Sequence, residues 1–233
     1  MSQCAPAQPM QAKEAYRLWA PEYDATLNPL LSLEQRCMAQ LIRAAAGCDA
    51  VDLGCGTGRW LTQLEAVGVR SLTGIDVCAE MLELAAKKLS SSARLILSDC
   101  QSTPLATASS DWIQSSFLLS YLEDLQRFAY EAARIARPCA TVMLSDVHPA
   151  TRDYGWKRTF SRADHVIQIE THPYQVSDLH GVMDRAGFEP IHFLEFPFGE
   201  QERTIFLQAG RPDLFERVKG LPALFIAGYR GRG

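Results

Sequence analysis

The stretch Val51-Asp52-Leu53-Gly54-Cys55-Gly56-Thr57-Gly58 decides the fold of this 233-residue chain. An apolar run ends in an acid, three glycines follow at alternate positions, and a helical pattern begins at Trp60. A strand that turns into a helix through glycines leaves backbone N–H groups free at the helix start, and it lets a ligand approach the main chain closely. The stretch therefore predicts a site for a nucleoside or an anionic group.

Strands and helices alternate downstream of this stretch. Apolar runs and apolar residues at helical spacing predict, in order, strand 50–53, helix 58–67, strand 71–76, helix 79–89, strand 94–98, strand 112–117, helix 122–136, strand 140–147, helix 176–187, strand 189–196, helices 200–208 and 213–218, and a last strand in 221–229. Such alternation implies right-handed crossovers and a parallel sheet that helices cover on both faces.

Two further segments flank and interrupt this pattern. The aromatic segment 15–24 precedes a helix expected over 32–46, which Ser32 and Gln35 would start as a capping box. Between residues 149 and 173 the alternation pauses, and apolar residues recur with period 2. We interpret this stretch as an inserted β-hairpin.

Three acids follow the expected strands at the edge where the glycines lie. Asp52, Asp76 and Asp99 end the first, second and third strands. A carboxylate at the position of Asp76 can accept hydrogen bonds from both hydroxyls of a ribose. The third glycine, Gly58, lies one residue earlier than the dinucleotide pattern G-x-G-x-x-G requires. Three acids suit a cationic nucleoside amino acid better than a pyrophosphate.

The chain resembles the class I S-adenosylmethionine (SAM)-dependent methyltransferases. The matching motifs, in the family's order and spacing, are VDLGCGTGRW, GIDVCAEMLELA, LSDC and DWIQSSFLLSYLEDL, and the resemblance covers about residues 14–230. It implies a Rossmann-like, doubly wound α/β fold with a mostly parallel seven-stranded sheet, an antiparallel last strand, an N-terminal helical arm and a small hairpin cap. The expected parts are a lid (1–48), a SAM-binding core (49–148), the cap (149–174) and the rest of the core (175–233).

The resemblance also implies a SAM site, with S-adenosylhomocysteine (SAH) as the product. The glycine loop would surround the methionine part, Asp76 would bind the ribose, Val77 and Met81 would flank the adenine, and Asp99 and Cys100 would meet its edge. Ser116 and Phe117 would lie beside the methyl group, and Tyr16 would act as a lid over the cofactor. The complete set is Tyr16, Asp52, Gly54, Cys55, Gly56, Gly58, Asp76, Val77, Met81, Asp99, Cys100, Ser116 and Phe117.

The acceptor side is less well defined by the sequence. His148 follows the fifth strand, where an imidazole could act as a general base or could equally shape the pocket wall. Many small-molecule members of the family carry a histidine where this chain has Ser120, so the role of that histidine does not transfer. The aromatic candidates for substrate contact are Trp19, Tyr23, Tyr154 and Trp156. Lys157 and Arg158 are interpreted as a solvated face.

Composition limits the other partners. The net charge of −4 and the pI of about 5.8 disfavour binding to a nucleic-acid backbone. No apolar run approaches the ~20 residues that cross a bilayer. Seven scattered cysteines indicate reduced thiols and a cytoplasmic protein, and no metal site is expected. The oligomeric state is not readable from the sequence.

We therefore expect SAM-dependent methyl transfer to a small organic metabolite. Three other functions remain open at this point: a methyltransferase for RNA or another nucleic acid, a SAM-binding protein without catalysis, and a NAD-binding oxidoreductase. The acidic pI and the lack of an Asn/Asp-Pro-Pro-aromatic motif after the fourth strand oppose the first. The glycine spacing and Asp99 oppose the last.

Overall fold

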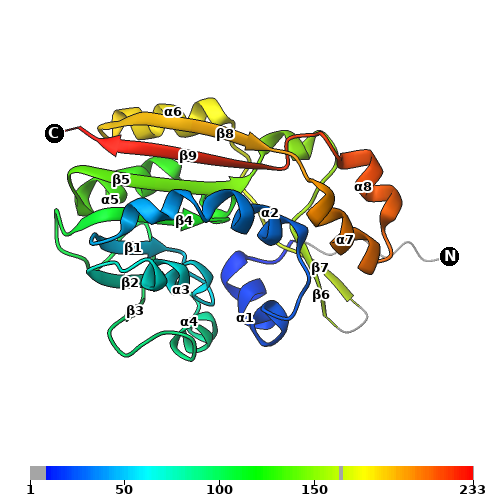
Figure 1. Ribbon diagram of the computed structural model, residues 1–233, viewed down its shortest axis with the longest axis horizontal. Coiled ribbons are helices and arrows are strands. Elements are labelled where there is room, and N and C mark those ends of the chain that lie inside the picture. The colour runs from blue at the N-terminus through cyan, green and yellow to red at the C-terminus, as the bar shows by residue number, and fades with distance from the viewer. Residues whose placement is uncertain (1–8, 163–164, 233) are drawn as a thin grey trace.

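The computed structural model describes residues 9–162 and 165–232 and contains one large sheet (Figure 1). Its strand order is β3-β2-β1-β4-β5-β9-β8, and the first five strands are parallel. The helical and strand bounds are α1 Ala12–Tyr23, α2 Pro29–Met38, η1 Leu41–Ala45, β1 Asp49–Leu53, α3 Arg59–Ala66, β2 Ser71–Asp76, α4 Ala79–Ala86, β3 Arg94–Leu97, β4 Ser110–Ser116, η2 Leu119–Tyr121, α5 Leu125–Ile135, β5 Ala136–Val147, η3 Pro149–Arg152, β6 Thr159–Arg162, β7 His165–Gln168, α6 Val176–Arg185, β8 Phe188–Phe196, α7 Glu200–Gln208, α8 Pro212–Val218 and β9 Leu224–Gly231.

Strand β9 confirms the expected antiparallel last strand. It lies between β5 and β8 and runs antiparallel to both, so the expected fold class is confirmed. The strands alternate their side chains between two cores, as a sheet covered on both faces requires. In β1, Ala50 joins the core beneath α2 and α3, whereas Val51 and Leu53 join the core beneath α5 and α6. Figure 1 shows α2 and α3 in front of the sheet and α5 and α6 behind it.

The helix expected over 32–46 begins earlier and divides in two. Asn28 is the N-cap of α2, its side chain accepts a hydrogen bond from the N–H of Leu30, and Pro29 occupies the first turn. This pair is the usual start signal of a helix, and the capping box at Ser32 and Gln35 was wrong. The α-helix ends at Met38, and residues 41–45 form a 3-10 helix.

The expected hairpin is the two-stranded sheet of β6 and β7, which pair antiparallel from Thr159–Gln168 to Arg162–His165. At its base, Met10 and Ile169 form a parallel bridge, and the N–H of Glu170 donates to the carbonyl of Met10. The hairpin and the N-terminal arm are therefore hydrogen-bonded to each other, and α1 lies beside β6 and β7 (Figure 1). None of the described helices combines the length and hydropathy that crossing a bilayer requires.

Candidate active site at the carboxyl ends of β1, β2 and β4

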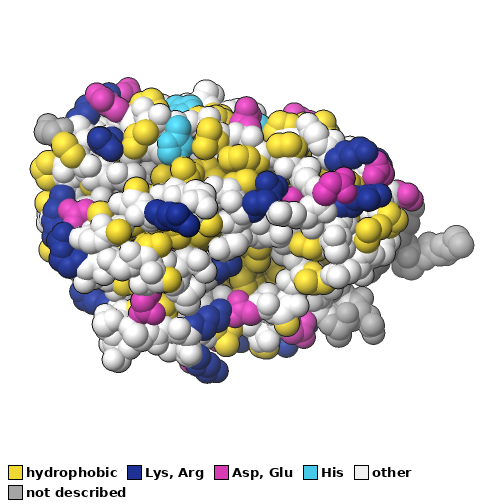
Figure 2. All heavy atoms as spheres, viewed as in Figure 1, with side chains coloured by type: hydrophobic (Ala, Val, Ile, Leu, Met, Phe, Trp, Pro, Cys, Tyr) yellow, Lys and Arg dark blue, Asp and Glu magenta, His cyan; other side chains and the backbone are white. Residues whose placement is uncertain are grey.

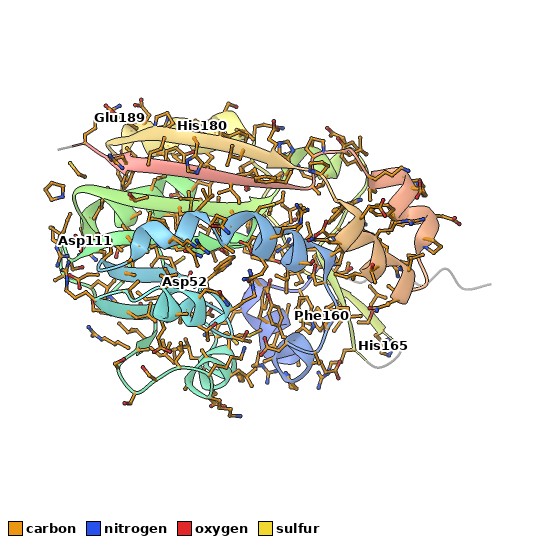
Figure 3. All side chains as sticks on the ribbon, viewed as in Figure 1. Asp52, Asp111, Phe160, His165, His180 and Glu189 are labelled. Atoms are coloured by element: carbon orange, nitrogen blue, oxygen red, sulfur yellow. The ribbon has the colours of Figure 1, made fainter. Side chains whose placement is uncertain are left out.

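A cavity of about 420 Å³ opens at the carboxyl ends of the central strands. The strand order reverses between β1 and β4, and ligands of open α/β sheets bind at such a switch point. The glycine loop after β1, the ends of β2 and β4, helix α1 and residues 170–172 contribute to its lining. In Figure 3, Asp52 lies between the β1–α3 ribbon and α1.

The glycine loop holds its shape through backbone conformation and one carboxylate. Gly54 and Gly56 have φ of +77° and +54°, which L-residues rarely adopt. A Cβ on Gly54 would also lie 2.9 Å from the side chain of Leu118. The N–H of Gly56 donates to Asp76 Oδ2 over 2.8 Å, so the loop is tied to the end of β2. The cavity wall here is main chain.

Asp52 presents a carboxylate without a protein partner. Its side chain is buried, and Oδ1 has no hydrogen-bond partner among the described residues. Burial raises the pKa of Asp52 to about 8; Glu34 and Asp76 add to the increase, and Arg59 opposes it. A buried acceptor without a donor is costly, and a cationic ligand group would relieve that cost.

Asp76 and Asp99 lie on the same side of the cavity. Asp76 Oδ1 accepts from the N–H of Cys78 over 2.9 Å. Burial raises the pKa of Asp76 although the N–H groups of Cys78 and Gly56 oppose the increase. Asp99 accepts from the N–H of Gln101 over 2.9 Å. Two apolar residues, Val77 and Met81, also line the cavity.

The structure places the predicted cofactor residues together, with one exception. The residues that line the cavity are Tyr16, Asp52, Gly54, Cys55, Gly56, Asp76, Val77, Met81, Asp99, Cys100, Ser116 and Phe117. Gly58 does not line it. It is the left-handed N-cap of α3, and a Cβ there would lie 3.0 Å from Cβ of Ala85 in α4. Gly58 therefore serves helix packing, and the structure does not place it with the other predicted cofactor residues.

Of the aromatic substrate candidates, only Tyr23 lines the cavity. Trp19 stacks on Phe160 instead, with ring centroids 5.0 Å apart and planes 9° apart. This contact joins α1 to the hairpin, and Figure 3 shows Phe160 beside α1. Trp19 therefore does not face the cavity, because the inserted hairpin supplies it with a hydrophobic partner.

His148, Tyr154 and Trp156 also lie outside the cavity lining. His148 Nδ1 accepts from the N–H of Ala150, and Nε2 lies 2.8 Å from Glu195 on β8. Both ring nitrogens are thus engaged away from the cavity. The turn η3 folds the next residues back, so that Trp156 stacks on Phe198 at 5.6 Å. The expectation that His148 faces the transfer site is not supported by this geometry.

Arg158 was misassigned to a solvated face. Its Nε donates to the hydroxyl of Tyr121 over 2.8 Å, and its guanidinium lies 5.4 Å from the ring centroid of Phe117. Burial lowers the pKa of Arg158, but Tyr121, Tyr16 and Asp146 outweigh it, so the pKa is raised overall. Lys157 is exposed, whereas the side chain of the next residue, Arg158, turns inward at the base of the hairpin.

A second buried ionic group lies behind the glycine loop. Glu34 of α2 is fully buried, pairs with Arg59 of α3 and accepts a hydrogen bond from Ser145. The hydroxyl of Ser145 lies 3.1 Å from that of Ser116, which lines the cavity. Sequence periodicity did not identify Glu34, since it lies next to the apolar stripe of its helix.

Comparison with known proteins gives the chemistry of this fold. Residues 51–144 match the family model described as a methyltransferase domain. The demethylmenaquinone methyltransferase of Roseiflexus sp. (strain RS-1) is 32% identical over 218 residues, which are 89% of this chain and 87% of that protein. The malonyl-[acyl-carrier protein] O-methyltransferase of Pectobacterium atrosepticum is 31% identical over 197 residues, covering 82% and 70%.

The chain belongs to the SAM-dependent methyltransferases. A solved SAM-dependent methyltransferase from Mesorhizobium loti has the same fold, with a TM-score of 0.66 and 22% identity over 85% of this chain and 99% of that one. This methyltransferase spans only 39% of another relative, a bifunctional biotin biosynthesis protein of Cellvibrio japonicus, which is 26% identical over 85% of this chain.

SAM is the methyl donor of the methyltransferase family, and the cavity suits it chemically. Asp52 offers an unpartnered buried oxygen for an ammonium group, and the glycine loop leaves main chain open to the ligand. No cluster of three metal-binding side chains occurs within 9–162 and 165–232.

Proposed function

We propose that this methyltransferase transfers the methyl group of SAM to a small organic acceptor. The observation that carries this proposal is one cavity whose lining includes both the acids at the strand ends and the tyrosines Tyr16, Tyr23 and Tyr121; we call these two groups of residues the acidic half and the aromatic half. The acidic half suits the cofactor, and the aromatic half, formed by Tyr16, Tyr23 and Tyr121, suits an organic acceptor.

The cofactor is assigned to the acidic half from its chemistry. In this proposal Asp52 binds the ammonium group and Asp76 the ribose hydroxyls. Val77 and Met81 hold the adenine by their apolar surfaces, and the edge of the base meets Asp99 and Cys100. Ser116 and Phe117 then border the methyl group, at the boundary between the two halves.

A bound sulfonium supplies an activated methyl group, so the protein needs to align the acceptor and exclude water. The aromatic residues of α1 can do both, because Tyr16 packs on Tyr121 with ring centroids 5.6 Å apart and both residues line the cavity. His148 has no part in this proposal, since its imidazole is engaged by Ala150 and Glu195.

Surface charge supports a small acceptor over a nucleic acid. The net charge is −4, and on the face shown in Figure 2 lysine and arginine side chains are interspersed with acidic ones. Binding to a nucleic-acid backbone requires a concentrated basic surface. The two relatives above are named for methyl transfer to malonyl-[acyl-carrier protein] and to demethylmenaquinone, neither of which is a nucleic acid.

The test is methyl transfer from radiolabelled SAM to a panel that contains a malonyl thioester, 1,4-dihydroxynaphthalene and total RNA. We expect label in a small acceptor and none in RNA. Transfer to RNA alone would contradict the proposal. Tight SAH binding without transfer to any of a broad set of acceptors would favour a SAM-binding protein without catalysis.

A further inference from the structure

A buried carboxylate behind the cavity is connected to it by two serines. Glu34 of α2 and Ser145 of β5 are fully buried, and Ser116 at the end of β4 lines the cavity. The hydroxyl of Ser145 donates to Glu34 Oε1 and lies 3.1 Å from the hydroxyl of Ser116. The three side chains form a continuous chain of hydrogen bonds from the interior to the cavity. The cofactor contacts proposed above use neither Glu34 nor Ser145.

The surrounding elements hold this chain in place. Ser116 and Ser145 lie opposite each other in the parallel pair of β4 and β5, and the N–H of Phe117 donates to the carbonyl of Ser145 over 2.8 Å. Helix α2 lies in front of the sheet (Figure 1), and its Glu34 meets Ser145 there. Arg59 of α3 pairs with Glu34, so the carboxylate is held from its other side as well. Each member of the chain is therefore fixed by a helix or a strand.

The number of available protons sets the direction of the hydrogen bonds. A hydroxyl has one proton to donate, and an ionised carboxylate has none. Glu34 accepts from both Arg59 and Ser145, so the proton of Ser145 is committed to Glu34. In the 3.1 Å contact between the two hydroxyls, Ser116 must then be the donor. Ser116 consequently presents oxygen lone pairs, and no proton, to a ligand in the cavity.

We infer that Ser116, Ser145 and Glu34 form a proton path, through which the protein removes the proton of a neutral hydroxyl group as that group is methylated. This inference rests on the proposed function, in which Ser116 borders the methyl group, and it adds the class of acceptor. A group that binds the lone pairs of Ser116 must bring a proton of its own, as a hydroxyl does. A general base has to lie within hydrogen-bond reach of the proton that it receives.

The step balances in atoms and charges. A lone pair of the acceptor oxygen forms the bond to the methyl carbon, the carbon–sulfur bond breaks, and its electron pair stays on sulfur as SAH forms. The acceptor proton moves to Ser116 Oγ, the Ser116 proton to Ser145 Oγ, and the Ser145 proton to Glu34. Both serines are then hydroxyls again, and Glu34 is a carboxylic acid. Once the products leave, the same path returns the proton to water in the cavity.

The chemistry of the product explains why a carboxylate is a sufficient base. An oxygen that attacks with its proton still attached becomes a protonated ether, which is a much stronger acid than the starting hydroxyl. A carboxylate accepts that proton readily, although it would not deprotonate the free hydroxyl. An acceptor that is itself a carboxylate has no proton to lose. Hydroxyl and carboxylate acceptors therefore differ in whether they need Glu34.

Two probes on the same ring system test the path: 2-naphthol, which carries a hydroxyl, and 2-naphthoate, which carries a carboxylate. Methyl transfer from radiolabelled SAM is measured with the wild type and with Ser145→Ala, which breaks the chain but keeps the pair of Glu34 and Arg59. We expect the variant to methylate 2-naphthol roughly 100-fold more slowly and 2-naphthoate at a rate changed by less than about twofold, since general bases contribute about 10²–10⁴-fold. Equal losses with the two probes, or no loss with either, overturn the inference.

Matched variants assign the effect to the named side chains. Glu34→Gln should show the same selective loss as Ser145→Ala. Ser115→Ala removes a buried serine hydroxyl of β4 outside the chain, which donates to the carbonyl of Leu53 over 2.7 Å, and it should leave the ratio of the two rates unchanged. His172, an imidazole in the cavity lining, is the alternative proton acceptor. A selective loss in His172→Gln and not in Ser145→Ala would overturn the inference.

The two probes also separate this failure from a failure of the proposed function. The melting temperature and the SAH affinity of each variant are measured first, so that a loss of folding is recognised. Transfer to 2-naphthoate or to the malonyl thioester, but not to 2-naphthol or 1,4-dihydroxynaphthalene, contradicts the proton path alone. A wild-type protein that does not transfer a methyl group to any small acceptor contradicts the proposed function itself.

Discussion

At the scale of single residues, the cavity contains two carboxylates, Asp52 and Asp76, whose pKa burial has raised. Asp52 has a pKa of about 8 in the folded protein, well above its ordinary value of 3.8, because it is desolvated and lies near other acids. Asp76 is oriented by two loop N–H groups. Each acid can be tested by a substitution that removes its carboxylate.

Asp52→Asn should stabilise the unliganded protein in a pH-dependent way. The folded pKa exceeds the unfolded one, so the wild-type protein loses stability as the pH rises from about 4 to about 8, and the penalty is constant above that range. One pKa unit corresponds to about 1.4 kcal/mol, and ~1 kcal/mol shifts Tm by about 2–4 °C at this chain length. The variant should therefore gain roughly 3–5 °C per pH unit relative to wild type across the middle of that range. Melting curves from pH 4 to 9 measure this gain, and a difference that does not depend on pH would contradict the assigned shift.

Asp76→Ala should weaken SAH binding by about 100-fold or more. The substitution removes the proposed ribose acceptor, and hydrogen bonds to a charged group contribute about 1.5–3 kcal/mol each. It also frees the N–H of Gly56, which holds the glycine loop to β2. Isothermal titration with SAH measures the effect. Glu83→Ala, an exposed acid on α4, is the matched control, and similar affinities for the two variants would refute the ribose assignment.

At the scale of elements, local patterns predicted the strands and the glycine loop because those features depend on neighbouring residues. The start of α2 was also readable, since Asn28 and Pro29 are a start signal that was passed over in favour of Ser32. Arg158 and Trp19 were not readable, because their partners Tyr121 and Phe160 lie 37 and 141 positions away in the chain. Contacts of this kind form only once the hairpin meets α1.

Trp19→Ala should loosen α1 over the cavity. Replacing a buried Trp by Ala costs about 3–5 kcal/mol, and here the lost packing is the contact between α1 and the hairpin. Hydrogen exchange of residues 12–23 and 159–162 should accelerate, and SAH should bind several-fold more weakly. Trp156→Ala, which loses a stack on Phe198 away from the cavity, is the control. If Trp19→Ala, like Trp156→Ala, left hydrogen exchange in residues 12–23 unchanged, the role of Trp19 in holding α1 in place would be contradicted.

At the scale of the whole molecule, the topology brings the site together from distant segments. The cavity receives residues from α1, the ends of the parallel strands and the segment after β7, so ligand binding bridges the N-terminal arm, the sheet and the hairpin. A ligand that binds only the folded state stabilises all of them together.

SAH at about 100 times its dissociation constant should add about 2.7 kcal/mol of stability. For a chain of this length that corresponds to a rise in Tm of roughly 5–10 °C. NAD at the same concentration should have no effect, since the position of Gly58 and the three acids disfavour a pyrophosphate. Differential scanning fluorimetry compares the two. Stabilisation by NAD and not by SAH would contradict the cofactor assignment.

The position of β9 has a consequence for the biogenesis of the protein. Its residues 224–231 fill the gap between β5 and β8, which do not pair with each other. Until residues 224–231 have left the ribosome, β8 cannot pair into the sheet, and the edge of β5 is exposed to other chains. A nascent polypeptide that stalls before residue 224 would expose that edge, and chaperones that recognise unpaired strands would bind the chain at this stage.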